Sequence, residues 1–252
     1  MITFTGRQEV LKPAQILERN ARNIYPHIST SRIKTHLDLD KPRPEFYIRL
    51  ARELKLIRHM IMESGDFYSA LIFGLQEGKL GNCTEDAIFT QLLGRINGQD
   101  NIYAGGIFIK DNLGKLKKLD HAVAFITNKN VQNNNEYLFK NKEAIIIDPW
   151  LNITDFASSY FAKIKTIFRN HFKALPNNNL GMELAKSESK TPKEHKQYMK
   201  DYGAHINFSI VPFIDENTNE NSIKELKELK KLFPKFTIKD YKKIKLPNKS
   251  TD

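Results

Sequence analysis

The chain has 252 residues, 40% hydrophobic and 27% charged, so it is long and apolar enough to form a substantial core rather than stay disordered. Lys and Arg number 40 against 29 Asp and Glu, and this net charge of +11 is typical of proteins that bind nucleic acid or an anionic surface. A single cysteine excludes an intramolecular disulfide and a multi-cysteine metal site, and no apolar run is long enough to span a membrane. The first residues lack the apolar segment of a secretory signal, so we expect a soluble protein made in a reducing compartment.

The positive charge is concentrated in the two flanks of the chain. Residues 1–60 hold 12 Lys/Arg and 6 Asp/Glu (+6), residues 61–185 hold 13 of each (0), and residues 186–252 hold 15 Lys and 10 acids (+5). In the last segment Glu alternates with Lys at helical spacing, and no zinc-finger or RNA-binding aromatic motif is present. The flanks therefore favour a solubilising or substrate-docking surface, with binding to nucleic acid or an anionic surface as the alternative.

The first predicted elements are helical. Apolar residues at three- and four-residue spacing predict a helix over 14–25 and a longer one over 46–65, followed by a short apolar piece over 67–75. Residues 1–75 are accordingly expected to form a helical N-terminal lobe or extension.

The pattern changes near Gly78, where a loop precedes a helix predicted from about Cys83 to about Ile96 and closed by Asn97-Gly98. Strand-like runs over 101–110, 121–127 and 143–148, joined by short turn-rich segments, predict an antiparallel meander. A helix over 153–172, a strand over 205–213 and a charged helix over 221–233 are expected next, and then a frayed tail from Pro234. The predicted fold class is α+β.

Three residues at the boundaries of these elements are candidates for catalysis. Cys83 begins a helix, where backbone N–H groups favour a thiolate, although a lone cysteine is often a small buried hydrophobe. His121 opens an apolar strand and suits either the base that activates a thiol or an edge-strand histidine. Asp148 ends a buried strand, where a carboxylate can orient an imidazole or simply terminate the strand. If the two strands pair, His121 and Asp148 meet at one end of the sheet.

These motifs together resemble the papain-like cysteine hydrolases, and more closely a branch of bacterial toxins and secreted effectors with a Cys-His-Asp triad. The resemblance covers about residues 76–150 and is carried by Gly81-Asn82-Cys83, Asp120-His121-Ala122 and Ile147-Asp148-Pro149-Trp150. It implies a papain-like core over 76–213, in which a nucleophile helix packs on an antiparallel sheet. A helical extension over 1–75 would precede that core, and a basic helix and tail over 214–252 would follow it.

The resemblance also implies roles for single residues. Cys83, His121 and Asp148 would be nucleophile, base and orienting acid, with no cofactor and no metal. Gln76, seven residues before Cys83, or Asn82 would bind the oxyanion, although Gln76 also suits an ordinary helix surface. Trp150 would contact substrate or serve as a core aromatic. The peptidase sequence around the nucleophile is absent, which argues against broad peptidase activity.

The resemblance favours deamidation of glutamine in a host protein by a bacterial effector that a specialised secretion system delivers into the host cytoplasm. Proteolysis, isopeptide cleavage and transglutaminase-type acyl transfer share the thioester step and stay open. Two alternatives come from other classes. The first is a basic binding protein without catalysis. The second is a metal hydrolase using Asp120, His121 and Asp148, although no HExxH-type cluster is present.

Overall fold

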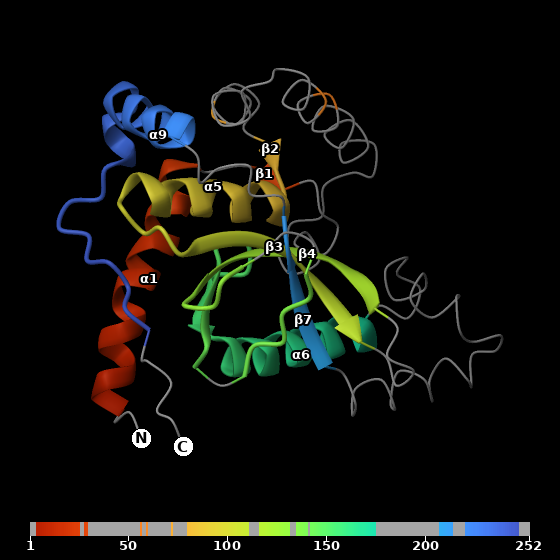
Figure 1. Cartoon of the computed structure of the whole chain (residues 1–252). Helices are drawn as coiled ribbons and strands as arrows, with labels where there is room; N and C mark the ends of the chain where they lie inside the picture. The colour runs from red at the N-terminus through yellow and green to blue at the C-terminus, as the bar shows by residue number, and fades with distance from the viewer. Residues whose placement is uncertain are drawn as a thin grey trace.

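The computed structural model in Figure 1 places helices on both faces of an antiparallel sheet. It describes residues 4–25, 28–29, 56, 59, 72, 80–110, 116–131, 135–140, 142–174, 207–213 and 220–246. The elements with described bounds include four α-helices and a five-stranded sheet, which confirms the predicted α+β class. None of the described helices is both long and apolar enough to cross a bilayer.

The sheet is a meander with one added strand. Its strands, in spatial order, are β6 (Ile153–Phe156), β5 (Ala144–Asp148), β4 (Leu116–Thr127), β3 (Ile102–Lys110) and β7 (Asn207–Pro212), and every neighbouring pair is antiparallel. The run from β3 to β6 follows the chain, so the predicted meander is confirmed, and β7 pairs with the other edge of β3. At this edge Gly105 is required, because a Cβ there would lie 2.7 Å from the carbonyl oxygen of Val211. A short parallel pair, β1 (Ile28–Ser29) and β2 (Leu80–Gly81), precedes the central helix.

The helices are α1 (Phe4–Ile24), α5 (Cys83–Ile96), α6 (Ala157–Ala174) and α9 (Glu220–Leu232), with a 3₁₀ turn at Pro234–Phe236. Helix α5 has the predicted bounds. Helix α1 begins earlier than predicted and continues through Pro13. The helix predicted over 153–172 is wrong in its first four residues, which form β6. Asn152 adopts a left-handed φ of 58° and turns the chain back from β5, so these residues complete the sheet before the helix starts.

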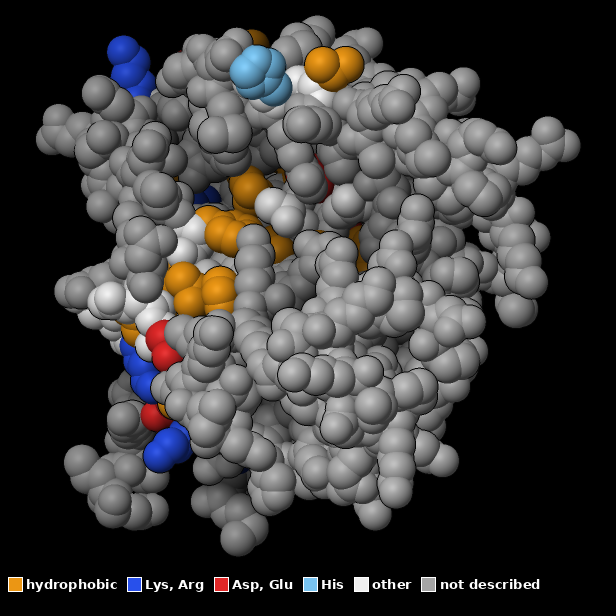
Figure 2. Space-filling view, turned by 90° about the vertical axis from the view of Figure 1, so that its right-hand side faces the viewer, with side chains coloured by type: hydrophobic (Ala, Val, Ile, Leu, Met, Phe, Trp, Pro, Cys, Tyr) orange, Lys and Arg blue, Asp and Glu red, His pale blue; other side chains and the backbone are white. Residues whose placement is uncertain are grey.

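Alternate residues of the central strands face two separate cores. Ala124 and Ile147 belong to the core shared with α1 and α5, whereas Phe125 and Ile146 belong to the core shared with α6. In Figure 1 α5 accordingly lies above the sheet and α6 below it. Figure 2 shows hydrophobic side chains of the described residues gathered in the middle of one face of the molecule.

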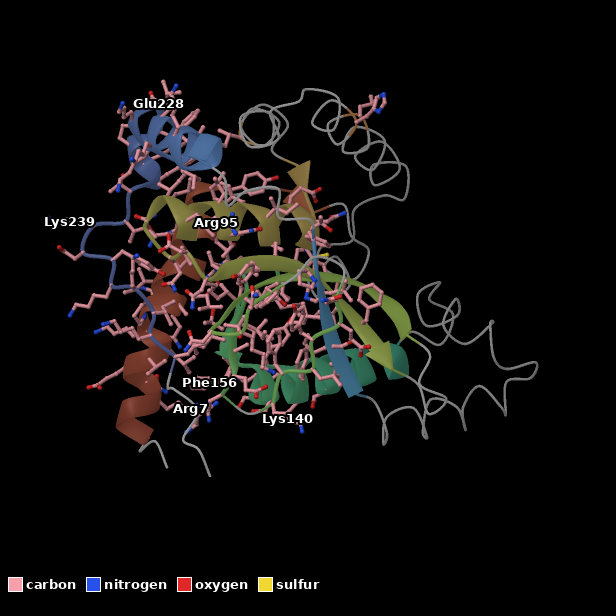
Figure 3. All side chains as sticks on the ribbon, in the orientation of Figure 1. Arg7, Arg95, Lys140, Phe156, Glu228 and Lys239 are labelled. Atoms are coloured by element: carbon pink, nitrogen blue, oxygen red, sulfur yellow. The ribbon has the colours of Figure 1, made fainter. Side chains whose placement is uncertain are left out.

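Helix α1 is tied to the far edge of the sheet by a cluster of charged and aromatic side chains. The Arg7 guanidinium donates to Asp155 Oδ1 at 2.6 Å and to Ser159 Oγ at 2.7 Å, and it lies 5.6 Å from the centroid of the Phe156 ring (Figure 3). Leu11, Ala14 and Leu17 pack in the same core as α5. The N-terminal helix therefore packs on the sheet and on α5.

The described C-terminal segment, residues 234–246, is packed, so the expectation of a frayed tail from Pro234 is wrong for these residues. Phe236, Ile238, Ile244 and Leu246 are buried in the core that α1 and α5 share. Asn97 and Gln99 hold this segment by hydrogen bonds to its backbone, at 2.8 Å to the Ile238 N–H and 2.7 Å to the Ile244 N–H. The buried residues are widely spaced among lysines, which hides their apolar pattern in the sequence.

Several predictions fall outside the described residues. The apolar piece over 67–75 and the helix over 46–65 do so except at three residues, Leu56, His59 and Ile72, each of which is helical. The division into units over 1–75, 76–213 and 214–252 stays a prediction, although the described parts of both flanks contribute to one core with α5.

Candidate active site

Cys83 is the first residue of α5, as its sequence context predicts. A capping box begins the helix: the backbone N–H of Asn82 donates to Glu85 Oε2 at 2.9 Å, and the Asn82 side chain accepts from the backbone N–H of Glu85. Cys83 is 7% exposed. Together with Ala87 of the same helix, it belongs to the core that α6 shares with the sheet. The cap fixes the first turn of α5 and with it the position of the sulfur.

His121 lies at an irregularity of β4. Gly106 of β3 pairs with Ala122 and Phe108 pairs with Lys118, so one residue of β3 lies opposite three residues of β4, numbers 119–121. A bulge of this kind bends the strand and redirects the side chains that it contains. The His121 side chain is 1% exposed, so the redirected imidazole is enclosed in the protein.

Asp148 ends β5 and reaches the imidazole from the neighbouring strand. Its Oδ2 lies 2.7 Å from His121 Nε2, and its Oδ1 accepts the backbone N–H of Leu151 at 3.0 Å. Ile147 is paired with Ala124 of β4, so continuing this register puts Asp148 diagonally across from His121. The sequence-predicted contact between the two residues is present, and both are fully buried.

The charged form of His121 is stabilised from two sides. Burial by itself lowers the pKa of His121, but the charge and hydrogen bond of Asp148 raise it, and a hydrogen bond and charge interaction with Cys83 raise it further, to about 10 from 6.5. Nε2 is the ring nitrogen that faces Asp148. The structure thus brings the three predicted catalytic residues together around one imidazole.

Tyr160 of α6 is a fourth member of this cluster that sequence reasoning missed. Its phenol donates to Asp148 Oδ2 at 2.6 Å and lies 3.3 Å from His121 Nε2. Burial, and then the charge of Asp148, raise the pKa of Tyr160 well above 10, so the phenol keeps its proton. One tyrosine among nine carries no local motif, and only the packing of α6 on β5 singles it out.

The remaining predicted residues have different outcomes. Trp150 is 3% exposed, and the centroid of its ring lies 5.2 Å from that of His121, so it packs on the imidazole. The Asn82 side-chain oxygen accepts the hydrogen bond that caps α5. Gln76 lies outside the described residues, and of Asp120 only the backbone is described.

No His, Cys, Asp and Glu side chains of the described ranges gather in a group of three or more that could hold a metal ion.

Comparisons with known proteins add no relative: the sequence matches no family model, and no curated protein and no solved structure is significantly similar to it.

Proposed function

We propose that this protein is a papain-like cysteine hydrolase that deamidates glutamine in a protein substrate, with Cys83 as nucleophile, His121 as base and acid, and Asp148 as the orienting carboxylate. The observation that carries the proposal is the buried imidazole, which Asp148 holds at 2.7 Å and whose charged form is stabilised by Asp148 and then by Cys83. A positive charge beside a cysteine sulfur favours the thiolate, which is the nucleophilic form.

The proposed reaction has two halves. The Cys83 thiolate attacks the carboxamide carbon, the carbon–nitrogen bond breaks, and the proton on His121 leaves with the nitrogen as ammonia. Water then attacks the thioester while His121 takes its proton, which yields the carboxylic acid and restores the Cys83 thiolate and the protonated His121. The net reaction converts a glutamine side chain and water to glutamate and ammonia.

The start of α5 supplies donors for the oxyanion. The first N–H groups of a helix have no partner within the helix, and they point towards negative charge at its N-terminus. The backbone N–H of Cys83 lies at this N-terminus and is the proposed first donor. The amide nitrogen of Asn82 and the side chain of Gln76 are the predicted second donors. Removing one oxyanion donor typically slows the reaction by roughly 10²–10³-fold.

Deamidation is favoured over the reactions that share its thioester. Cys83 is 7% exposed, and the slender side chain of glutamine reaches a recessed sulfur more readily than a main-chain amide does. The motif resemblance to bacterial effectors favours the same reaction, and with it a host protein as substrate and delivery into the host cytoplasm. Proteolysis or isopeptide cleavage is the nearest alternative, and acyl transfer to an amine follows.

The test is mass spectrometry of a eukaryotic cell lysate incubated with the wild-type protein or with Cys83→Ala. Glutamine-to-glutamate conversion that depends on Cys83 supports the proposal. New chain ends that depend on Cys83 would indicate a protease, and amine adducts an acyl transferase. If no change in the lysate depends on Cys83, the hydrolase proposal fails.

A second candidate function comes from another class, a basic binding protein without catalysis. In the described C-terminal segment Lys227, Lys230, Lys239, Lys242 and Lys245 are all exposed, and Figure 3 shows Lys239 pointing outward from the molecule. Binding of nucleic acid or anionic vesicles that weakens steeply with salt and persists in Cys83→Ala would favour this function.

A further inference from the structure

Two buried side chains, those of Tyr160 and His121, share one carboxylate oxygen of a third buried residue, Asp148. Asp148 Oδ2 lies 2.6 Å from the Tyr160 hydroxyl oxygen and 2.7 Å from His121 Nε2, and the two donor atoms lie 3.3 Å apart. The side chains of His121 and Asp148 are 1% and 0% exposed, and Tyr160 is 0% exposed. Water therefore does not replace any of these contacts, and the two donors divide one acceptor between them.

A second donor weakens the hold of a carboxylate on the first. Each hydrogen bond to an ionised carboxylate draws negative charge from it, and bonds to charged groups are stronger than neutral ones. The short bond from Tyr160 therefore leaves Asp148 less able to stabilise a proton on His121. The phenol stays protonated in this environment, so it remains a donor throughout.

We infer that Tyr160 is a positioning residue of this site: its hydroxyl competes with His121 for Asp148 Oδ2 and so limits how firmly the imidazole holds its proton. The inference rests on the proposed function, in which His121 must release that proton to the leaving nitrogen. An imidazolium held too firmly is a poor general acid. Tyr160 would thus keep a strongly buried His–Asp pair usable for proton transfer.

The other groups near the imidazole are named so that the effect of Tyr160 can be separated from theirs. Cys83 on α5 interacts with the imidazole directly, and the Trp150 ring covers it without a titrating group. Glu18 on α1 is close enough to Asp148 for their charges to interact, and burial and that charge raise the pKa of Glu18. All of them stay unchanged when only the phenol is altered.

The test is an NMR titration of the His121 ring nitrogens in ¹⁵N-histidine-labelled full-length chain. It is made in a Cys83→Ser background. Removing the thiol removes one of the interactions that raise the pKa of His121, so the titration midpoint moves to a lower and less alkaline pH. Three chains are compared with that background: Tyr160→Phe, 3-fluorotyrosine at position 160, and Tyr137→Phe. The last removes a phenol that donates to the carbonyl of Asn130 instead.

The titration midpoint of His121 is expected to rise by about 1 pH unit in Tyr160→Phe, because Asp148 then serves a single donor. It is expected to fall with 3-fluorotyrosine, whose more acidic phenol is a stronger donor, and to stay unchanged in Tyr137→Phe. An unchanged midpoint in both Tyr160 variants, or a shift with the same sign in both, overturns the inference. If Tyr160→Phe does not fold, the fluorotyrosine chain decides alone.

The readout needs no substrate, so its failure is distinct from failure of the proposed function. A midpoint that moves as expected in a protein whose effects on a lysate do not depend on Cys83 would uphold the Tyr160–Asp148–His121 relationship and remove the hydrolase. A Cys83-dependent reaction, together with a His121 midpoint that does not change in the Tyr160 variants, would support the hydrolase and overturn the inference about Tyr160.

Discussion

His121 Nε2 and Asp148 Oδ2 lie 2.7 Å apart between neighbouring strands, with their side chains 1% and 0% exposed. The two residues are separated by 27 positions in the chain, and the pairing of β4 with β5 brings them together. A buried carboxylate that meets an imidazole in this way stabilises the protonated imidazole and raises the pKa of His121. Most of the expectations below depend on the proton that His121 then holds.

The first prediction concerns the carboxylate itself. Replacing Asp148 by Asn removes the charge that faces His121 and leaves one acceptor oxygen in place of the two that Tyr160 and the Leu151 N–H use. Breaking a buried charge pair costs roughly 3–5 kcal/mol of unfolding free energy when one partner is removed. We expect a loss towards that range, measured by urea denaturation at neutral pH.

Asp155→Asn is the matched control for this change. Asp155 is the acidic partner of Arg7 and Lys163. Its own side chain is 8% exposed, but the side chains of the two cations are 37% and 53% exposed, so solvent screens the cationic member of each pair. Its replacement should cost about 1 kcal/mol. Equal losses in the two variants would mean that the pair formed by Asp148 and His121 has no special stabilising role.

The second prediction is a pH dependence of stability that originates in His121. The pKa of His121 is raised to about 10 from 6.5, so the stabilisation is fully present below about pH 6.5. Between the two values the folded state keeps a proton that the unfolded state has lost, and the free energy of unfolding therefore falls as the pH rises. Urea midpoints measured across this interval should decline in a Cys83→Ser background, in which ionisation of the thiol cannot offset the proton that His121 holds.

The decline should flatten in His121→Gln and persist in His59→Gln, which alters an exposed histidine. The same slope in all three chains would assign the pH dependence to other groups and contradict the raised pKa of His121.

The third prediction concerns the packed C-terminal segment. Gln99 accepts the Ile244 N–H at 2.7 Å and donates to the Ile244 carbonyl at 3.3 Å, so Gln99→Ala leaves buried backbone groups without these partners. We expect a loss of about 1–3 kcal/mol in unfolding free energy and faster protease cleavage within 234–246. Lys245→Ala, on an exposed side chain of the same segment, should change stability by about 0.5 kcal/mol or less.

Should Gln99→Ala behave like Lys245→Ala in both assays, residues 234–246 would not be held by Gln99. The His121 titration should be the same in both variants, because neither residue contacts the imidazole among the interactions that the structure describes.

The elements that the sequence predicted well are those marked by local chemistry. Asn82 caps α5, and Asn97-Gly98 ends it, with Gly98 at a φ of 86°. The residues next to each end of this helix therefore predict where it begins and ends. The meander was predictable because β3, β4 and β5 are apolar runs with short connections. The contact between His121 and Asp148 followed directly from pairing two of these strands.

What the sequence could not indicate depends on packing between distant segments. The bulge at His121 arises from the mismatch between β3 and β4. Gly106 of β3 lies beside it, but residues 119–121 of β4, which form the bulge, include no glycine or proline. Tyr160 acquires its partner only when α6 packs on the sheet. Ile244 is buried because Gln99, far away in the chain, satisfies its backbone. Each of these features is a long-range event with no local signal.

The most direct test of the account is the ultraviolet difference absorbance of the Cys83 thiolate at neutral pH. The chain has one cysteine, so subtracting the spectrum of Cys83→Ser isolates the sulfur, and the method does not depend on access of a reagent to a thiol that is 7% exposed. We predict thiolate absorbance in the folded wild-type protein that is lost in His121→Gln and in urea. A folded wild-type protein without thiolate absorbance, or absorbance that persists in His121→Gln, would contradict the proposed Cys83–His121 pair.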